Sequence, residues 1–198
     1  EMTKAVFSGI EVAMRILEPQ AVTVGIEDHM IDAMITMRNY ALKYKNVKVV
    51  PLPTLYPQGA ERVLVRELTQ KRVQRLARDV GVLVLNVATC AAIGQAVTHG
   101  IPLISRIITV SGTIPEKSYN YRVRIGTPIK TLLLELSPDR ANKLGDVNVI
   151  MGGPMRGLAQ HSLEVPVIKG TTGILALNHT TYEEQMCIRC GRCIDVCP

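Results

Sequence analysis

Two apolar stretches, Ala21-Val-Thr-Val-Gly-Ile26 and Val47-Lys-Val-Val-Pro51, decide the fold of the first half of the chain. Both are short, rich in β-branched residues and bounded by turn residues, which is typical of buried strands. The apolar residues between them recur at helical spacing, and Asp28 is placed to cap that helix. A strand, a helix and a second strand in this order form the repeating unit of a parallel sheet.

The same alternation extends on both sides of this unit. Apolar spacing predicts three further helices, over residues 2–17, 60–68 and 88–98. The near-continuous apolar run 80–86 is typical of a parallel strand covered on both faces. We therefore expect a three-layer, Rossmann-like α/β domain over residues 1–103. Such sheets bind ligands at the carboxyl ends of their strands, here the loops after Ile26, Leu52 and Asn86.

The second half of the chain has a different pattern: short predicted strands are separated by turn residues. These candidates occupy residues 107–112, 121–125, 147–151 and 165–169. One helix, over residues 129–136, lies among them, with Gly126 as the turn, Thr127 as the cap and Pro128 at the first helical position. We expect a small α+β domain over residues 104–169.

Residues 170–186 are predicted to form a polar connection. A run of four cysteines follows and ends the 170–198 segment. The run is Cys187-Ile-Arg-Cys190-Gly-Arg-Cys193-Ile-Asp-Val-Cys197-Pro198. Its C-x2-C-x2-C-x3-C-P spacing is the bacterial iron–sulfur pattern, in which three thiolates bind one 4Fe-4S cluster and the fourth binds a neighbouring cluster. We expect the start of a ferredoxin-like domain, with Cys187, Cys190 and Cys193 on one cluster and Cys197 on another. The remaining ligands would follow Pro198.

Other uses of clustered cysteines fit this run poorly. A zinc ribbon has two C-x2-C pairs separated by a longer insert, which the chain lacks. Disulfides between cysteines three residues apart would be strained, and they belong to secreted domains. Arg189 and Arg192 within the run either raise the potential of a cluster or are ordinary solvated cations. The fifth cysteine, Cys90, is flanked by apolar residues and is expected in the core.

Composition excludes some classes of function. The chain has no Trp, one Phe and six Tyr, so few rings are available to stack on bases, and we expect no nucleic-acid partner. The net charge of +6 fits either an acidic partner or ordinary solubility. The longest uncharged stretch, residues 80–98, contains polar residues and reads as strand then helix, so we expect no transmembrane helix. Because the chain begins at Glu1 without a Met, we expect it to be part of a longer protein.

The sequence does not assign a functional site to the two glycine-containing turns or to the histidines. Tyr56-Pro-Gln-Gly59 is a turn by composition that would also bring the Gln58 amide near a bound cofactor, and both interpretations stay open. Gly152-Gly-Pro-Met-Arg-Gly157 lacks both phosphate-loop patterns and is interpreted as a tight turn. The four histidines are too scattered to bind one metal, and no nucleophile, base and acid grouping stands out. We therefore predict no catalytic residues, and the cofactor-binding residues stay unassigned.

An ordered set of short motifs resembles the RnfC family, which supplies one component of the Rnf ion-translocating electron-transport complex. The motifs are Tyr56-Pro-Gln-Gly59, Asp79-Val-Gly-Val-Leu-Val-Leu-Asn-Val-Ala-Thr89, Thr109-Val-Ser-Gly112, Met151-Gly-Gly-Pro-Met155, Lys169-Gly-Thr-Thr-Gly-Ile174 and the cysteine run. The cysteine run alone is shared by many proteins, whereas this upstream series is similar to the RnfC family and its relatives. The NADH- and FMN-binding subunit of respiratory complex I is a more distant relative.

The resemblance implies a peripheral subunit on the cytoplasmic side of the bacterial inner membrane. It implies an FMN-binding α/β domain, a β-grasp soluble-ligand-binding (SLBB) domain over residues 104–169 and a C-terminal pair of 4Fe-4S clusters. Electron partners would be NAD(H) and ferredoxin, and the other Rnf membrane subunits would couple the transfer to ion translocation. Hydride carries two electrons and a cluster carries one, so a flavin between them is chemically required.

Departures from the family pattern leave two alternatives. The glycine-rich nucleotide loop of the family and its acidic segment lie upstream of the residues that match Glu1. The segment 70–78 is basic where a Gly/Pro-rich connection is expected, and Ala88 stands where Gly or Glu is usual. One alternative is a soluble NADH-dependent cobalamin reductase, a related protein. The other is a non-catalytic docking fragment.

Overall fold

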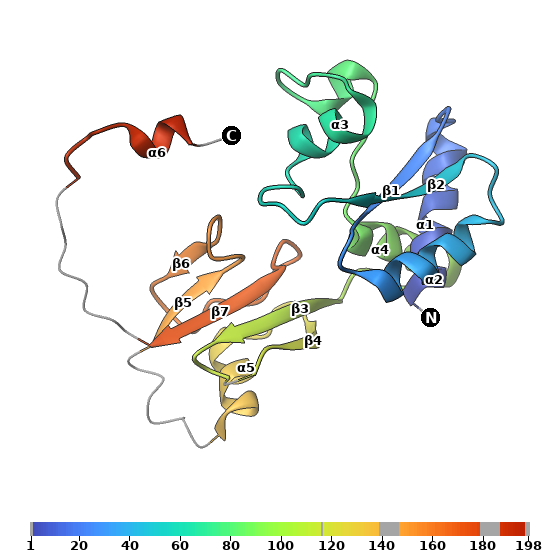
Figure 1. Ribbon diagram of the computed structural model, residues 1–198. Coiled ribbons are helices and arrows are strands. Elements are labelled where there is room, and N and C mark those ends of the chain that lie inside the picture. The colour runs from blue at the N-terminus through green and yellow to red at the C-terminus, as the bar shows by residue number, and fades with distance from the viewer. Residues whose placement is uncertain (1, 116, 139–146, 179–186, 197–198) are drawn as a thin grey trace. The chain divides into compact units, whose positions relative to one another are not determined.

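The strand, helix, strand pattern of residues 21–51 is present as predicted. The computed structural model describes residues 2–115, 117–138, 147–178 and 187–196 (Figure 1). Helices and sheets occur in both of the units into which the chain divides, Glu1–Ile104 and Ser105–Pro198, so the mixed α/β class is confirmed.

The sheet of the first unit consists of two parallel strands. Strand β1 (Val22–Glu27) pairs with β2 (Val47–Leu52). The two are connected by helix α2 (Ile31–Ala41). This helix begins later than expected: Met30 is its N-cap residue, and Asp28 makes no cap. The prediction for Asp28 is wrong because its carboxylate binds the Thr54 hydroxyl instead.

Helices α1 (Met2–Leu17) and α4 (Val87–His99) cross at unusually short range. The predicted bounds of α1 are confirmed, and α4 ends as expected at Gly100, whose left-handed conformation closes the helix. Two glycines permit the crossing. A Cβ on Gly9 would lie 1.8 Å from the Cys90 carbonyl oxygen, and a Cβ on Gly94 would lie 2.2 Å from the Ala5 carbonyl oxygen. Only a residue without a side chain fits at either position.

The core of the first unit lies against one side of the two-stranded sheet. Alternate β1 residues, Val22, Val24 and Ile26, pack into it, whereas Thr23 and Gly25 are exposed. Its buried members come from α1, α2, β2 and α4: Val6, Phe7, Ile10, Met37, Ala41, Val47, Cys90 and Ala91. A three-layer arrangement therefore stays a prediction for this unit.

The predicted strand over residues 80–86 is not formed. Helix α3 (Glu61–Thr69) is followed by a short 3-10 helix, η1 (Ala77–Val80), and residues 82–86 then continue to α4 without pairing in a sheet of the described chain. Val82 and Val84 pack on a small core of Val65, Val73 and Ala77, and Leu83 is 59% exposed. Packed and exposed side chains alternate here as they do in an extended strand. The described residues, however, include no neighbouring strand with which this segment could pair.

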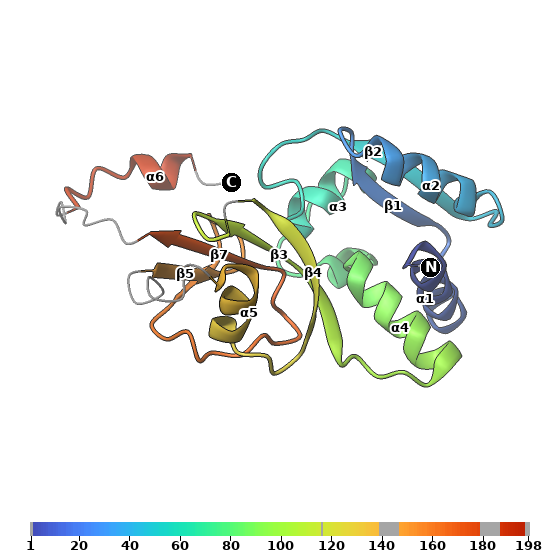
Figure 2. The ribbon, with the colours of Figure 1, turned by 90° about the horizontal axis from the view of Figure 1, so that it is seen from below.

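The second unit contains a five-stranded mixed sheet with the order β4-β3-β7-β5-β6. Its strands are β3 (Ser105–Gly112), β4 (Tyr119–Arg124), β5 (Val147–Met151), β6 (Leu158–Gln160) and β7 (Gly173–Asn178). Figure 2 shows α5 (Ile129–Leu136) lying across one face of this sheet. The core between them includes Ile108 and Val110 of β3, Ile129 and Leu133 of α5, and Ile174 and Ala176 of β7. Helix α5 covers the predicted residues 129–136, but Pro128, which is expected at the first helical position, is its N-cap residue in place of Thr127.

The central strand of this sheet differs from the prediction. Strand β7 lies within residues 170–186, for which a polar connection is predicted, and it pairs with both β3 and β5. That prediction is wrong for residues 173–178, and residues 179–186 lie outside the described residues. The strand predicted over 165–169 is also wrong, because only Pro166 makes a bridge there, to Pro128. Proline has no N–H to donate to a ladder.

No helix in the described parts of the chain has both the length and the apolar composition needed to cross a bilayer.

Candidate functional site

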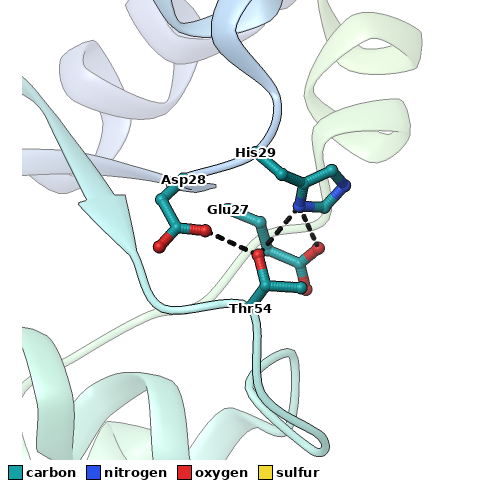
Figure 3. Close-up of polar contacts among 4 residues, drawn as sticks. All are labelled: Glu27, Asp28, His29 and Thr54. Atoms are coloured by element: carbon teal, nitrogen blue, oxygen red, sulfur yellow. Dashed lines mark hydrogen bonds and ion pairs between the residues drawn. The ribbon is translucent and has the colours of Figure 1, made fainter.

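Four polar residues gather where β1 and β2 end, and Figure 3 shows them. The hydroxyl of Thr54 donates a hydrogen bond of 2.6 Å to Oδ1 of Asp28. Oγ1 of Thr54 also lies 2.8 Å from Nδ1 of His29. Because the hydroxyl proton points to Asp28, Nδ1 of His29 must be the donor to Thr54. This contact fixes the imidazole as the tautomer that carries its proton on Nδ1.

The parallel register explains the gathering. Glu27 is opposite Leu52, so the loop after β1 and the loop after β2 leave the same edge of the sheet, as the sequence predicts. Glu27 adds a second carboxylate, whose Oε2 lies 3.6 Å from Nδ1 of His29. The side chains of His29 and Glu27 are 54% and 44% exposed. This edge cluster (Glu27, Asp28, His29 and Thr54) therefore offers solvent-facing acceptors suited to the hydroxyl groups of a ligand.

The third loop of the predicted edge has a local structural role. The Asn86 side chain is the N-cap of α4, and its Oδ1 accepts a hydrogen bond of 2.9 Å from the backbone N–H of Ala88. This bond satisfies one of the free donors at the start of the helix. Capping of α4 is thus a structural role for Asn86 that requires no ligand.

Gln58 carries a buried donor without a partner. Its residue is 7% exposed, and Nε2 has no hydrogen-bond partner among the described residues. The turn around it is held by the backbone, since the N–H of Gln58 donates to the Leu55 carbonyl at 2.7 Å. An unpaired buried donor costs about 1–3 kcal/mol. A ligand carbonyl would remove that cost, so the observation fits the cofactor interpretation of the turn.

The sequence predicts this edge but not the residues that occupy it. It assigns Asp28 to a helix cap and leaves His29 as one of four scattered histidines, and it gives Glu27 and Thr54 no role. The available signal is positional: polar residues follow two neighbouring strands of one sheet, at the point where each strand ends.

The cysteine segment presents exposed, free thiols. Cys187, Cys190 and Cys193 are exposed and form no disulfide. Cys197 lies outside the described residues. The backbone N–H of Arg189 donates a hydrogen bond to Sγ of Cys187 at 3.4 Å. Within the described residues no three Cys, His, Asp or Glu side chains are close enough to hold a metal ion, so this structure does not gather the cysteines.

The backbone around these cysteines turns sharply. Arg189 has φ of 55° and Gly191 has φ of 80°, and Gly191 is the N-cap residue of the short helix α6 (Arg192–Asp195). A chain that turns twice within five residues can place several side chains around one small object. The donor set consists of three thiols on a tightly turning segment, and its chemistry therefore fits a 4Fe-4S cluster.

The fifth cysteine is structural. Cys90 is 7% exposed and packs in the core of the first unit, as predicted. Burial raises the pKa of its thiol, which opposes thiolate formation and hence nucleophilic or metal-binding chemistry.

Comparison with known proteins shows which domains and which proteins the chain resembles. A family model described as the Nuo51 FMN-binding domain matches residues 1–95, and one described as a 4Fe-4S binding domain matches residues 180–198. The chain thus joins a flavin-domain segment to an iron–sulfur segment. Over its whole length it is similar to proteins named as the C subunits of ion-translocating oxidoreductase complexes, so the resemblance of its motifs to the RnfC family is confirmed.

The relatives show how much of an RnfC protein is covered. The chain is 43% identical over 203 residues to the C subunit of the proton-translocating ferredoxin:NAD(+) oxidoreductase complex of Clostridium ljungdahlii, covering 100% of this chain and 44% of the relative. It is 41% identical over 206 residues to the C subunit of the ion-translocating oxidoreductase complex of Pseudomonas aeruginosa, covering 100% of this chain and 26% of the relative. With the corresponding Rhodobacter capsulatus protein the identity is 39% over 210 residues, 100% of this chain and 39% of the relative. The chain therefore spans less than half the length of these relatives.

Proposed function

We propose that the chain is the part of an RnfC protein that passes electrons between NAD(H), FMN and 4Fe-4S clusters. In the whole complex this transfer is coupled to ion translocation. The observation that carries the proposal is the match to RnfC proteins along the whole chain, in which a flavin-domain segment precedes an iron–sulfur segment. The relatives are named for ion-translocating complexes, which favours this function over a soluble cobalamin reductase.

Cys187, Cys190 and Cys193 are proposed as ligands of one 4Fe-4S cluster, and Cys197 as a ligand of a second cluster. Support comes from the exposure of the three described thiols and from the two sharp turns of the backbone between them. The clusters supply one-electron transfer, and a flavin converts between this and the two-electron hydride. The exposed position of the segment suits exchange with a partner.

The flavin contacts proposed for this chain lie at the carboxyl edge of β1 and β2. Gln58 offers Nε2, a buried donor that lacks a partner among the described residues, to a carbonyl of the cofactor. The carboxylates of Glu27 and Asp28 offer acceptors to hydroxyl groups of a cofactor or of NAD(H). These contacts orient the ligand, and the redox chemistry belongs to the cofactor.

The finer architecture is part of the same proposal. A three-layer arrangement of the first unit requires further strands and helices beyond those described. The five-stranded sheet with α5 on one face supports a β-grasp SLBB domain for the second unit, and its central β7 extends that domain to residue 178. We place the protein at the cytoplasmic face of the membrane, where it contacts the other Rnf subunits and exchanges electrons with ferredoxin and NAD(H).

The test uses the full-length gene product prepared without oxygen. We expect about eight irons with matching acid-labile sulfide. Stoichiometric FMN and NADH-driven reduction of the clusters, followed by electron paramagnetic resonance, are expected as well. Cys190→Ser should remove the iron of one cluster, while the matched control Cys90→Ser retains all of it. Bound zinc without acid-labile sulfide would contradict the cluster assignment. Full iron content without flavin and without NADH-driven reduction would contradict the proposed electron transfer and favour the docking function.

A further inference from the structure

Helix α3 and the segment 70–80 form a strongly basic part of the first unit, which we call the cationic lobe. It lies around the α3 label in Figure 1. Six exposed basic residues are present: Arg62, Arg66, Lys71, Arg72, Arg75 and Arg78. Only three acidic residues accompany them, so twenty residues provide an excess of three positive charges, half of the chain's net +6.

The fold of the lobe holds these charges in place. Val65 of α3 packs with Val73 and Ala77, which docks the irregular segment onto the helix. Nη2 of Arg62 donates to the Arg75 carbonyl at 3.3 Å, so cations from the helix and from the segment are neighbours. Arg66 follows Arg62 by one helical turn and therefore lies on the same side of α3. The cations are thus displayed on a packed scaffold.

The carboxylates of the lobe are largely occupied by the backbone. Oε1 of Glu61 accepts a hydrogen bond of 3.0 Å from the N–H of Ala77, and Oδ2 of Asp79 accepts one of 3.1 Å from the N–H of Leu76. The ion pairs of the described chain lie elsewhere, at His29–Glu27 and Lys130–Glu164. The three carboxylates of the lobe offset half of its six positive charges, and the remaining excess acts on its surroundings.

We propose that the cationic lobe is the docking surface for a protein that presents a carboxylate-rich face, in particular the carrier that exchanges electrons with this subunit. This inference rests on the proposed electron-transfer function. Five of the six cations are arginines, whose planar guanidinium groups pair with carboxylates in bidentate geometry. Long-range attraction by such a lobe raises the rate of encounter, as a transient carrier requires.

An anionic membrane surface is the competing partner, and the lobe suits it less well. Residues 61–80 contain no aromatic side chain, whereas peripheral membrane segments combine basic residues with aromatic anchors. The exposed carboxylate of Glu67 lies among the cations and would be repelled by a uniformly anionic membrane surface. A protein face with discrete charges accommodates this mixed pattern.

The experiment compares two charge-reversal variants of the full-length protein. The lobe variant is Arg66→Glu, Arg72→Glu and Arg78→Glu, three exposed cations whose reversal leaves the contact between Arg62 and Arg75 intact. The matched control is Arg38→Glu, Lys45→Glu and Lys48→Glu, which reverses three exposed cations outside the lobe. The probe is a bacterial ferredoxin of strongly negative net charge. Its association rate constant is measured by stopped flow over a range of salt concentrations.

We expect the lobe variant to associate roughly 10- to 100-fold more slowly than the unmodified protein at low salt, with a shallower dependence on salt. The control should change the rate by less than about threefold, in keeping with screening of distant charges. Equal loss in both variants, or no loss in either, would overturn the proposal. So would binding of phosphatidylglycerol vesicles that depends on the lobe while ferredoxin association does not.

A second readout separates this proposal from the proposed function. The three substituted arginines are not among the proposed cofactor contacts or cluster ligands, so the lobe variant should retain NADH-driven reduction of the protein's own clusters in full. If the unmodified protein shows no such reduction, the proposed electron-transfer function fails, whereas the comparison of ferredoxin association rates still decides whether the lobe docks an acidic protein.

Discussion

The backbone of Gly9 lies against the backbone of Cys90, so closely that a methyl group on Gly9 would be 1.8 Å from the Cys90 carbonyl oxygen. Gly9→Ala must therefore separate α1 from α4 or distort one of them. We expect the free energy of unfolding, measured with urea, to fall by roughly 2 kcal/mol, since overpacking outweighs the better helix propensity of alanine.

Gly59→Ala is the matched control for this change. A Cβ at Gly59 would meet nothing within 4 Å. The control should be neutral or slightly stabilising, because alanine restricts the unfolded chain. Equal stabilities of the two variants would show that α1 and α4 do not meet as described.

Tyr44 and Glu11 join α1 to the segment after α2, through a hydrogen bond of 2.5 Å from the tyrosine hydroxyl to Oε1 of Glu11. Burial first, and then this carboxylate, raise the pKa of Tyr44 from 10.0 to about 12. A raised folded pKa means that the contribution to stability is complete below pH 10 and is lost as the pH rises through 12.

Tyr44→Phe removes the hydroxyl and keeps the stacking on Phe7, whose ring centroid is 5.4 Å away. The stability difference between the unmodified protein and this variant should therefore shrink as the pH rises from 10 to 12, in urea unfolding at each pH. Glu11→Gln, which keeps an acceptor without charge, should lower the apparent pKa of Tyr44. A stability difference that stays constant with pH would contradict the contact.

Much of the fold is predictable because local pattern and packing agree there. The strands over 22–27 and 47–52 and the helix over 129–136 have apolar residues at the spacing that their buried faces need. Strand β7 escapes prediction because the flanking Gly170 and Thr171 suggest a connection, and because a central strand has apolar residues on both faces and so shows no alternation. Pairing with β3, over sixty residues earlier, cannot be read from a local window.

The candidate site divides in the same way. The cysteine ligands are predictable because their spacing along the chain is itself the signal. The edge cluster is assembled by the parallel register, which brings His29 to Thr54 across 25 residues. Likewise, nothing local marks Gln58 as buried with an unpaired amide, since that property depends on what surrounds the turn.

Gln58→Met tests the proposed cofactor contact through opposing effects. The change removes a buried donor without a partner among the described residues, so the flavin-free protein should be stabilised by about 1 kcal/mol. The holoprotein should at the same time release FMN faster, which fluorescence of the free flavin reports. Gln74→Met, at an exposed glutamine, is the control and should alter neither property. A stabilised variant with unchanged FMN release would show that the amide does not contact the cofactor.

Thr54→Val tests the hydrogen-bond arrangement of the edge cluster. In the native cluster the Thr54 hydroxyl donates to Asp28 and accepts from Nδ1 of His29. Nitrogen-15 NMR of the neutral imidazole should therefore show a protonated Nδ1, the tautomer that is less common in free histidine. Valine should return His29 to the Nε2-protonated form, while Thr54→Ser preserves the native signal. A native spectrum with the proton on Nε2 would reverse the assigned donor.

The accessibility of the cysteines separates ligand candidates from the core thiol. In iron-free protein, Cys187, Cys190 and Cys193 are exposed and should react rapidly with a maleimide. Cys90 is buried and its pKa is raised, so its reaction requires local opening and should be on the order of 100-fold slower. Peptide mass spectrometry at successive times gives each rate. Reconstitution with iron and sulfide should protect the three exposed thiols and leave Cys90 unchanged, whereas continued labelling of all three would exclude them as cluster ligands.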